Sequence, residues 1–330
     1  MKKFIVAAFV LLAGWSQNSG QAIAQDYPTR AIRIVVPFAP GGGTDVLARI
    51  VAQRLSEKWG QGVVVENQPG ASGSIGSKAV ERAAPDGYTL VMASTGALMS
   101  MATFYAKNGP FDVNAHFAPV TLVADPPYVI TVSKELPVKN VAELIALARA
   151  KNGGITFGSS GVGAASHLSG ELFQKEAGVT MLHVPYKGTG AAVTDLLAGR
   201  IDVMFAPPQT VEPLVKAGKL KVLATTGMTR SPLFPDLPTA NESGLPGYES
   251  VGWFGLLAPA HTPQAIVDKL NAATVAILKT PDVTERLAKL GAQAHPMTPA
   301  EYGRFITADL AKWTQVMHDA EAKQQNGAKK

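Results

Sequence analysis

The sequence predicts an α/β protein with two domains, on three observations. Between residues 32 and 94, short β-rich runs alternate with segments in which apolar residues recur at helical spacing, which is typical of βαβ units on a parallel sheet. A strand, a loop rich in glycine and serine, and a helix recur from residue 155 on, in a second α/β block. A chain of 330 residues is also long enough for two domains of ordinary size.

The first 24 residues are typical of a secretory signal peptide. Lys2 and Lys3 precede the apolar run Phe4–Ala13, and the small residues Ala22-Ile23-Ala24 form a cleavage site. About 10 apolar residues are too few to span a bilayer, which needs about 20. The chain contains no cysteine to carry a lipid anchor at the cleavage point. We therefore expect a soluble periplasmic protein without a lipid anchor.

Composition argues against several classes of function. Without cysteine the chain has no disulfide, no thiolate catalysis and no thiolate metal site, and its six histidines show no metal-ligand spacing. The formal charge falls from +5 to +3 when Lys2 and Lys3 leave with the signal peptide, and the remaining basic residues are scattered. We therefore expect no metal and no nucleic-acid partner.

The stretch Pro37–Asp45, with the sequence PFAPGGGTD, is predicted to connect a strand at residues 32–36 to a helix. Its three glycines permit a tight turn and the close approach of a ligand. Thr44 is a good N-cap residue, so the free N–H groups of the first helical turn would point into the loop. Such a loop can bind an anion through its backbone. A tight turn without any ligand is the alternative.

The rest of the first block continues the alternation. Strands are expected at Val63–Val65 and Tyr88–Ala93, and between them a helix at Ser74–Ala84 that Pro85-Asp86-Gly87 ends. The third strand leads into a second small-residue loop, Ser94-Thr95-Gly96-Ala97, before another helix.

Two crossings between the domains are predicted from β-rich runs. Phe117–Val123 and Tyr128–Val132 are separated by Asp125-Pro126-Pro127, and Trp253–Ala258 is the candidate for the return. The predicted division is residues 1–24 as signal peptide, 25–123 with 251–330 as a discontinuous first domain, and 124–250 as the second domain.

The second block begins with a helix that Asn140 caps, with Glu143 three residues on. A strand at Ile155–Phe157 leads into the loop Gly158–His167 and a helix that stops at Gly178. The elements expected after it are strands at Met181–Val184, Ile201–Phe205 and Lys221–Thr225, a helix at Ala191–Leu197, an ordered loop at Gly227–Gly247, helices at Pro263–Leu278, Pro281–Leu290 and Pro299–Ala320, and a frayed end at Gln324–Lys330.

The two glycine-rich loops predict a ligand site. In open α/β sheets, ligands bind at the carboxyl ends of strands, on the loops that lead into helices. Phe38–Asp45 and Gly158–His167 are two such loops, and on different domains they would face each other across a cleft. We expect N–H groups at Gly41–Thr44 and Ser159–Gly163 to hold an anionic group there.

Motifs of common enzymes and cofactor sites are not found in the sequence. It contains no G-x-S-x-G or H-E-x-x-H, and the first glycine loop lacks the Lys-Ser/Thr ending of a P-loop. Gly161–Ser166 approaches a dinucleotide fingerprint, but serine replaces its third glycine, and His183 and Val184 stand where a ribose-binding acid is expected. We therefore expect no catalytic residue and no cofactor.

Several polar residues of these loops have two possible roles. Ser159, Ser160 and Ser166 can contact a ligand, cap the helix, or do both, and His167 can contact a ligand or pack. Asp45 would repel a plain diacid and suit a ligand ammonium or hydroxyl, or it would only favour the helix N-terminus.

Five segments together resemble one family. They are PFAPGGGTD, ENQPGASGSIGS, PDGYTL, FGSSGVGAASHLSGELF and VPYKGTGAAVTDLLAGRIDVMF. They are similar to those of the Bug family, the extracytoplasmic solute-binding receptors of tripartite tricarboxylate transporters, over essentially the whole mature chain. The resemblance implies a type II periplasmic-binding-protein fold, with two α/β domains and a ligand cleft between them. It also implies a ligand among citrate-like acids, acidic amino acids and aromatic carboxylates.

The resemblance also implies where the ligand binds. Receptors of this family hold one carboxylate through main-chain and hydroxyl groups of two loops, often with ordered waters. Those loops correspond here to Phe38–Asp45 and Ser159–His167, and the Ser94-Thr95-Gly96 loop borders the same cleft. The expected ligand-binding residues are Phe38, Ala39, Gly41, Gly42, Gly43, Thr44, Asp45, Ser94, Thr95, Ser159, Ser160, Gly161, Gly163, Ser166 and His167.

The leading hypothesis is a monomeric periplasmic receptor that captures a small carboxylate for the membrane components of a tripartite tricarboxylate transporter. One alternative is an exported enzyme that uses His167 with Ser166 or Ser169. Another is a sensor module that presents its closed form to a signalling partner.

Overall fold

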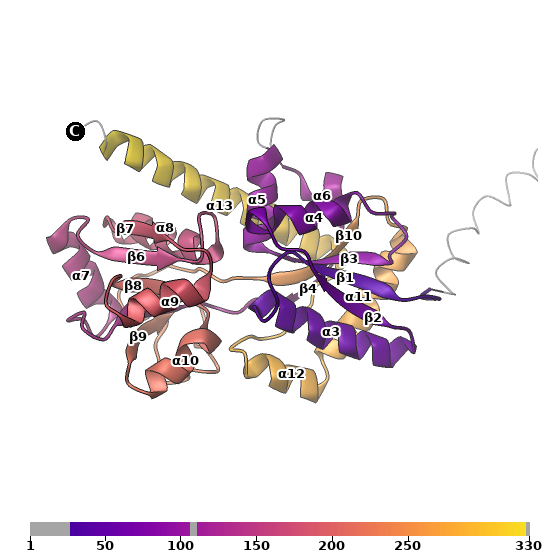
Figure 1. Ribbon diagram of the computed structural model, residues 1–330, viewed down its shortest axis with the longest axis horizontal. Helices are drawn as coiled ribbons and strands as arrows, with labels where there is room; N and C mark the ends of the chain where they lie inside the picture. The colour runs from indigo at the N-terminus through magenta and orange to yellow at the C-terminus, as the bar shows by residue number, and fades with distance from the viewer. Residues whose placement is uncertain (1–26, 106–110, 328–330) are drawn as a thin grey trace, which may run out of the picture.

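The computed structural model describes residues 27–105 and 111–327. They form two five-stranded sheets with helices packed on them, which makes two lobes side by side (Figure 1). This confirms the predicted α/β class. The signal peptide predicted at residues 1–24 lies outside the described residues.

The first lobe is built on a sheet of order β2-β1-β3-β10-β4. Strand β1 runs parallel to β2 and β3, whereas β10 is antiparallel to β3 and β4. Its strands are β1 (Ile32–Val36), β2 (Val63–Asn67), β3 (Thr89–Ser94), β4 (Phe117–Ala124) and β10 (Phe254–Pro259). Its helices are α3 (Gly43–Trp59), η1 (Ala71–Gly73), α4 (Ser74–Glu81), α5 (Thr95–Tyr105), α6 (Val113–His116), α11 (Gln264–Leu278), α12 (Pro281–Ala288) and α13 (Pro299–Gly327).

The second lobe repeats this arrangement with the order β7-β6-β8-β5-β9. Strand β6 runs parallel to β7 and β8, and β5 is antiparallel to β8 and β9. In each sheet the antiparallel strand is the one that follows a crossing from the other lobe. The strands are β5 (Val129–Ser133), β6 (Thr156–Ser159), β7 (Leu182–Pro185), β8 (Val203–Ala206) and β9 (Leu220–Thr225). The helices are α7 (Val141–Lys151), α8 (Ala165–Ala177), α9 (Thr189–Leu197) and α10 (Pro208–Lys216).

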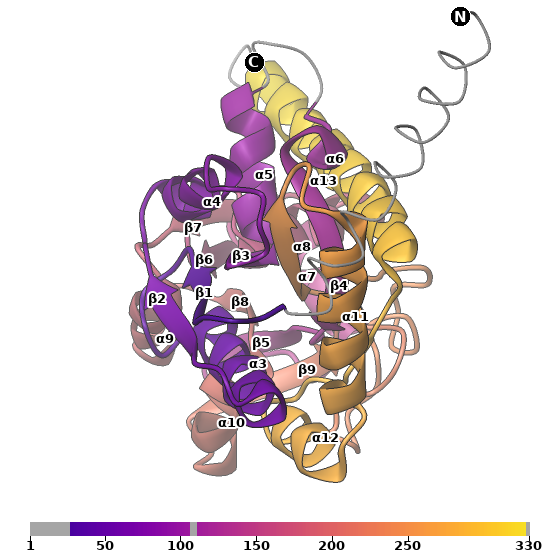
Figure 2. The same ribbon diagram turned by 90° about the vertical axis from the view of Figure 1, so that its right-hand side faces the viewer.

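Successive apolar side chains along the strands of the first sheet point to opposite faces, so both faces of the sheet are apolar. Val35 joins the buried cluster that includes α13, whereas its neighbour Ile34 joins the cluster of α3 and α11. Figure 2 shows the result, with α4, α5 and α13 on one face of the sheet and α3 and α11 on the other. The sheet is therefore covered by helices on both faces, and its strand ends carry the connecting loops.

Two crossings join the lobes and lie side by side. The N–H of Gly252 donates to the carbonyl of Pro126 at 3.1 Å, and Pro127 pairs with Val251 as an isolated β-bridge. These are the segments in which the sequence predicts the division between the two domains.

Helix α13 makes a third connection, which the sequence did not indicate. It begins in the first lobe and reaches over the second, where it packs on α8 (Figure 1). Trp313 and Val316 are buried, and Lys175 of α8 forms an ion pair with Asp319 at 2.7 Å. The C-terminal half of α13 therefore contacts the lobe opposite the one in which it starts.

Most predicted elements are confirmed within a few residues, including the Asn140 cap, whose side chain accepts from the N–H of Glu143. Three differences have physical reasons. Thr44 is not the N-cap of α3, because the helix starts two residues earlier than expected, at Gly43, and Gly42 is the N-cap without a side-chain bond. Helix α13 continues to Gly327 through a run of Ala, Glu, Lys and Gln, which favour helix, where fraying was expected. Helix α10 was missed because its prolines suggest a loop.

Candidate functional site

The candidate site lies at the carboxyl ends of parallel strands in both sheets. In the first lobe, the loop Phe38–Asp45, here called the first loop, follows β1. The neighbouring strand β3 ends at Ser94 and α5 begins at Thr95, so the loop predicted at residues 94–97 is absent and the strand passes directly into the helix, at a point here called the β3–α5 junction. A side chain at Gly73 would place its Cβ 3.1 Å from Cζ of Phe38 and 2.9 Å from Cβ of Ala97. The first loop and the β3–α5 junction therefore pack around the turn η1 and occupy one edge of the sheet.

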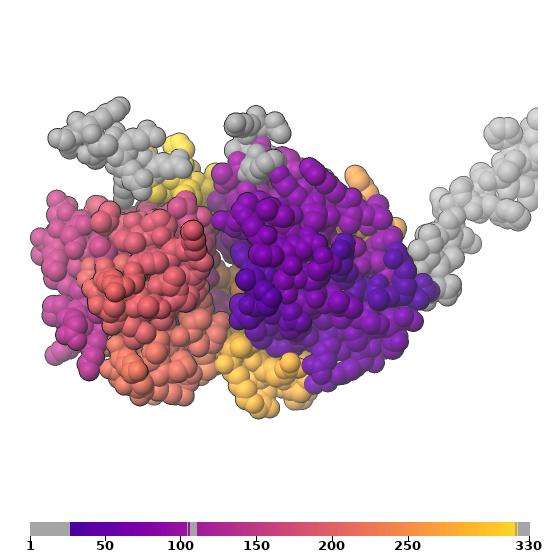
Figure 3. Space-filling model, viewed as in Figure 1, coloured from indigo at the N-terminus to yellow at the C-terminus, as the bar shows by residue number. Residues whose placement is uncertain are grey.

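Two contacts show that loops of the two lobes face each other. A Cβ at Gly96 would lie 3.8 Å from Cα of Ala164, in the loop Ser159–His167, here called the second loop. A Cβ at Gly43 would lie 3.7 Å from Nε2 of Gln209, which begins α10 of the second lobe. Figure 3 shows the hollow between the lobes, with the first loop on its border. The predicted cleft residues are thus brought together from both sheets.

The first loop is fixed by the carboxylate of Asp45. Its Oδ2 accepts from the N–H of Gly41 at 2.9 Å and from Nε of Arg49 at 3.0 Å, and its Oδ1 accepts from Nδ2 of Asn67 at 2.9 Å. The same Asn67 amide donates to the carbonyl of Phe38 at 3.1 Å. Because Arg49 lies one turn along α3 and Asn67 ends β2, these bonds tie both ends of the loop to the scaffold.

Asp45 is 3% exposed and stays ionised in this setting. Burial by itself would raise the pKa of its carboxyl, but the hydrogen bonds from Arg49, Gly41 and Asn67 outweigh burial, so the pKa is lowered. Its oxygens are used within the protein. The geometry therefore favours a role of Asp45 in stabilising the first loop and the N-terminus of α3, rather than a direct contact with the ligand.

Helix α3 leaves N–H groups of the first loop available. The N–H of Val46 bonds the carbonyl of Gly42, whereas no bond within the described residues involves the N–H of Gly42, Gly43 or Thr44. Gly41 and Gly42 are exposed, and Ala39 is exposed beside them. The N–H of Gly41 already donates to Asp45, so the expectation that residues 41–44 hold an anion is wrong for Gly41. The N–H groups of residues 42–44 can still donate to an anion.

The second loop is organised by buried hydroxyls. Ser159 is fully buried, and its Oγ accepts from the N–H of Gly161 at 3.2 Å. Oγ of Ser166 accepts from the N–H of Ser160 at 3.0 Å and lies 3.1 Å from Oγ of Ser160. None of the three serines caps α8, whose N-cap is Ala164. These hydroxyls therefore stabilise the conformation of the loop by accepting hydrogen bonds from its own backbone.

Two stacked histidines support the same loop. The rings of His167 and His183 are 3.9 Å apart between centroids, and Phe157 stacks on His183 at 4.8 Å. Nδ1 of His167 accepts from the N–H of Gly163 at 3.1 Å, and its Nε2 lies 3.4 Å from Oε1 of Glu171. His183 places Nε2 2.7 Å from Oγ of Ser159. Burial and then His167 lower the pKa of His183 to about 3.

These bonds change which N–H groups of the second loop are available. Those of Ser160, Gly161 and Gly163 donate to Ser166, Ser159 and His167, so the expectation that residues 159–163 hold the anion is wrong for these three groups. The first turn of α8 takes their place. No partner within the described residues bonds the N–H of Ala165 or Ser166.

The β3–α5 junction adds one more polar group. Ser94 Oγ accepts from the N–H of Ala97 at 3.4 Å. Thr95 is 1% exposed, and its Oγ1 has no hydrogen-bond partner in the described part of the chain. A buried hydroxyl without a partner is costly, so it is a candidate contact for a bound ligand.

Sequence reasoning missed four residues at this site. Asn67 and His183 were missed because they act from neighbouring strands, β2 and β7. Gln209 was hidden in the proline-rich start of α10, and Phe254 was read only as part of a crossing strand, although its ring would lie 3.5 Å from a Cβ at Gly43. No local pattern marked any of them.

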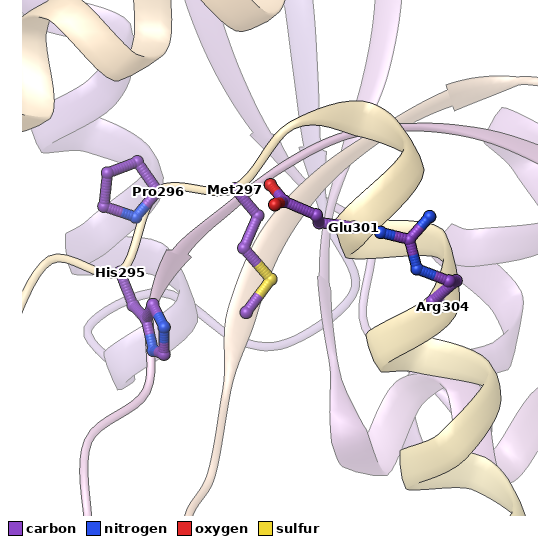
Figure 4. A pocket seen from close by; sticks show the side chains of 5 residues that line it. All are labelled: His295, Pro296, Met297, Glu301 and Arg304. Atoms are coloured by element: carbon purple, nitrogen blue, oxygen red, sulfur yellow. The ribbon is translucent and has the colours of Figure 1, made fainter.

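A hollow elsewhere on the molecule does not involve the predicted residues. It has a volume of about 330 Å³ and is lined by His295, Pro296, Met297, Glu301 and Arg304 (Figure 4). Nδ1 of His295 lies 2.6 Å from Oδ2 of Asp125, in the first crossing. Across the residues that the structure describes, no cluster of three or more His, Cys, Asp or Glu side chains could hold a metal ion.

Comparison with known proteins gives a consistent picture. A family model described as "Tripartite tricarboxylate transporter family receptor" matches residues 47–321. Among solved structures, Rpa4515 of R. palustris with adipate is 36% identical, with a TM-score of 0.78 over 90% of this chain and 99% of that one. The periplasmic binding protein BugD is 36% identical, with a TM-score of 0.75 over 89% and 99%. MatC of Rhodopseudomonas palustris with bound malate is 33% identical, with a TM-score of 0.76 over 88% and 99%.

Proposed function

The chain belongs to the family of tripartite tricarboxylate transporter receptors, and we propose that it is a periplasmic receptor that captures one small carboxylate between its lobes. It would act as a monomer and deliver the ligand to the membrane components of such a transporter. The resemblance seen in the sequence is thereby confirmed at the level of the family.

One observation carries the proposal. Helices α3 and α8 begin in loops that face the same cleft, and their first-turn N–H groups have no partner within the described residues. Hydrogen bonds to a charged group contribute about 1.5–3 kcal/mol each, and a helix N-terminus adds about 0.3–1 kcal/mol. Two such ends supply about 8 kcal/mol, which corresponds to roughly micromolar affinity. No arginine is needed.

We assign the ligand contacts to the two loops and to the β3–α5 junction. Direct contacts are proposed for the N–H groups of residues 42–44, for those of Ala165 and Ser166, and for the hydroxyl of Thr95. Asp45, Ser159 and His167 are proposed to hold the loops in shape. Structures of relatives with adipate and malate support a carboxylate as the ligand class.

An enzyme is the competing function, because Oγ of Ser159 and Nε2 of His183 are 2.7 Å apart, like a nucleophile and its base. Two facts argue against this reading. Ser159 is fully buried, and the pKa of His183 is lowered to about 3, so His183 is a weak base near neutral pH. His167 directs its nitrogens to Gly163 and Glu171. We propose binding without turnover.

The proposed location is the periplasm, with residues 1–24 removed. In the described ranges 27–105 and 111–327, no helix is both long and apolar enough to cross a membrane. Mass spectrometry of the mature protein should find an N-terminus at or near Gln25. Retention of Met1 would contradict the export proposal.

A thermal-shift screen tests the function. The panel contains mono-, di- and tricarboxylates, amino acids and aromatic acids, and the hits are then assayed for chemical change of the ligand. A ligand at 100 times its Kd adds about 2.7 kcal/mol of stability. We expect stabilisation by at least one acid, with one ligand bound per chain and recovered unaltered. No stabilisation by any carboxylate would overturn the receptor proposal, and turnover would favour the enzyme.

A further inference from the structure

Gln209 is a polar residue that reaches the cleft from the side opposite the first loop. It is the second residue of α10, which follows β8, and β8 runs parallel to β6. The carboxyl ends of β6 and β8 therefore lie at one edge, and Gln209 stands beside the second loop. Pro207 and Pro208 precede it and restrict the backbone that presents it.

The Gln209 side chain extends to the other lobe. Its Nε2 lies 3.7 Å from the position of a Cβ on Gly43, and the ring of Phe254 approaches the same position to 3.5 Å. Next to it, a Cβ at Gly291 would lie only 2.8 Å from Cγ of Pro208, so the start of α10 packs on the segment that follows α12. Figure 1 shows α10 and α12 facing each other across the two lobes.

The side-chain amide of Gln209 contains an unsatisfied hydrogen-bond acceptor. Its Oε1 is buried and has no partner within the described residues. Rotating the amide would place the NH₂ group in the same position, and a donor would then lack a partner instead. A buried polar atom of this kind costs stability unless a bound molecule satisfies it.

We propose that Gln209 is a specificity-determining residue that selects small carboxylates carrying a hydroxyl group over matched acids without one. This inference rests on the proposed function. The anchored carboxylate would occupy the helix N-termini, and the amide would meet the substituent on the ligand's carbon chain.

The reason is the complementarity of an amide and a hydroxyl. A hydroxyl both donates and accepts, so it can satisfy Oε1. A second carboxylate has no donor near neutral pH, so it can bond only the N–H side of the amide and leaves the oxygen desolvated. A site built to hydrogen-bond a hydroxyl rejects the analogue that lacks it, because its own buried group is then left unpaired.

Malate and succinate make the sharpest pair of probes, since they differ by one hydroxyl. Calorimetric titration should show that the wild type prefers malate, on the order of tenfold. In Gln209→Met, which has similar length and no hydrogen-bonding group, the ratio of the two affinities should fall close to one through weaker malate binding. Gln209→Glu keeps an acceptor but adds a charge, so both affinities should fall while malate remains preferred.

Controls separate selection from a purely structural contact. Gln315→Met, on the exposed face of α13, makes the same chemical change away from the cleft and should leave both affinities unchanged. Melting of each variant without ligand shows whether it is folded. If Gln209 were only a contact between the lobes, Gln209→Met would weaken malate and succinate equally, and the inference would be overturned.

The remaining outcomes are also decisive. A wild type that binds both acids with equal affinity, or a ratio that Gln209→Met leaves unchanged, would overturn the role of Gln209 and leave the receptor proposal intact. If neither these acids nor any other carboxylate binds the wild type, the receptor proposal fails, and this inference fails with it.

Discussion

The two loops of the candidate site present backbone N–H groups in the same way but are held by different chemistry. The first loop is tied down by charge: Asp45 joins Gly41, Arg49 and Asn67. The second loop is tied down by neutral groups, namely serine hydroxyls and a stacked pair of histidines. Backbone N–H donors can therefore be held in a similar arrangement either by a charged carboxylate or by neutral side chains.

Because one loop is held by a charged group and the other by neutral groups, the two loops should respond differently to mutation and to pH. Arg49 is half exposed, and Asp45 is ionised at any pH near neutral, so the first loop depends on an ion pair that is partly open to solvent. The second loop packs on a neutral His183, because burial lowers the pKa of this ring to about 3 and a proton there would place a charge inside the stack. The first loop should respond to removal of charge, and the second to addition of a proton.

The largest effect should come from valine in either loop. Gly42→Val and Gly163→Val both place a branched side chain where the ligand approaches, and loss of two bonds of about 1.5 kcal/mol each weakens binding on the order of 100-fold. The backbones differ, since φ is −77° at Gly42 and 75° at Gly163. Only Gly163→Val should also lower the melting temperature, because valine avoids positive φ.

Calorimetric titration with a confirmed ligand, alongside melting without it, checks this prediction. Gly42→Ala is the mild control, because its Cβ would have no neighbour closer than 3.8 Å. Full binding by both valine variants would refute the two-loop site.

Removing the charge at Asp45 should have the next largest effect. In Asp45→Asn one carboxylate oxygen becomes an NH₂ group, which accepts no hydrogen bond. The side chain can then no longer accept from Gly41, Arg49 and Asn67 together, so the first loop loosens. Affinity should fall by about 1–3 kcal/mol for plain diacids and for amino or hydroxy acids alike. Titration with succinate, malate and aspartate measures it, with Asp268→Asn, on an exposed position of α11, as control. A loss confined to amino or hydroxy acids would show that Asp45 contacts the ligand.

Acid should act on the second loop through His183. Its pKa is about 6.5 in the unfolded chain and is lowered to about 3 in the fold, so the unfolded state binds more protons between these values. The stability it contributes is therefore present above about pH 6.5 and is lost as the pH falls toward 3. Urea unfolding at pH 7 and pH 4.5 should show a smaller loss in His183→Phe than in the wild type.

Asp309 must be considered in the same measurement, because its contribution to stability changes with pH in the opposite direction to that of His183. Burial raises the pKa of this carboxyl to about 6, despite hydrogen bonds from Trp253 and Trp313. Its contribution is fully present below about pH 4 and is lost as the pH rises through 6, by up to about 3 kcal/mol. The comparison is therefore made between variant and wild type at each pH. An identical pH dependence in both would contradict the role given to His183.

Thr44→Ala should have the smallest effect. The Thr44 hydroxyl does not cap α3, but the residue is buried, so Thr44→Ala should lower the free energy of unfolding by about 1 kcal/mol through lost packing of its methyl group. Binding should weaken by about 1 kcal/mol only if the hydroxyl touches the ligand. Unfolding and titration of Thr44→Ala and Thr44→Ser separate these effects, because Thr44→Ser removes the methyl group and keeps the hydroxyl. A loss of stability in Thr44→Ala that Thr44→Ser does not share would restore Thr44 as a helix-capping residue.

The sequence by itself determined the framework of this protein. The period-2 and helical apolar patterns gave nearly every strand and most helices, because backbone geometry imposes these periods locally. The glycine loops were predicted correctly as connections between strands and helices, and Asn140 was identified as a cap from two residues. The family followed from motifs spread over the whole chain.

Only the tertiary structure decided what the loop side chains do. Asn67 reaches Asp45 because β2 pairs with β1, and His183 stacks on His167 because β7 pairs with β6. The sequence could not show which N–H groups these partners consume, or that Gln209 lies beside Gly43 of the opposite lobe. Such pairs depend on the order of strands in a sheet and on the packing of two lobes, and neither leaves a local pattern in the chain.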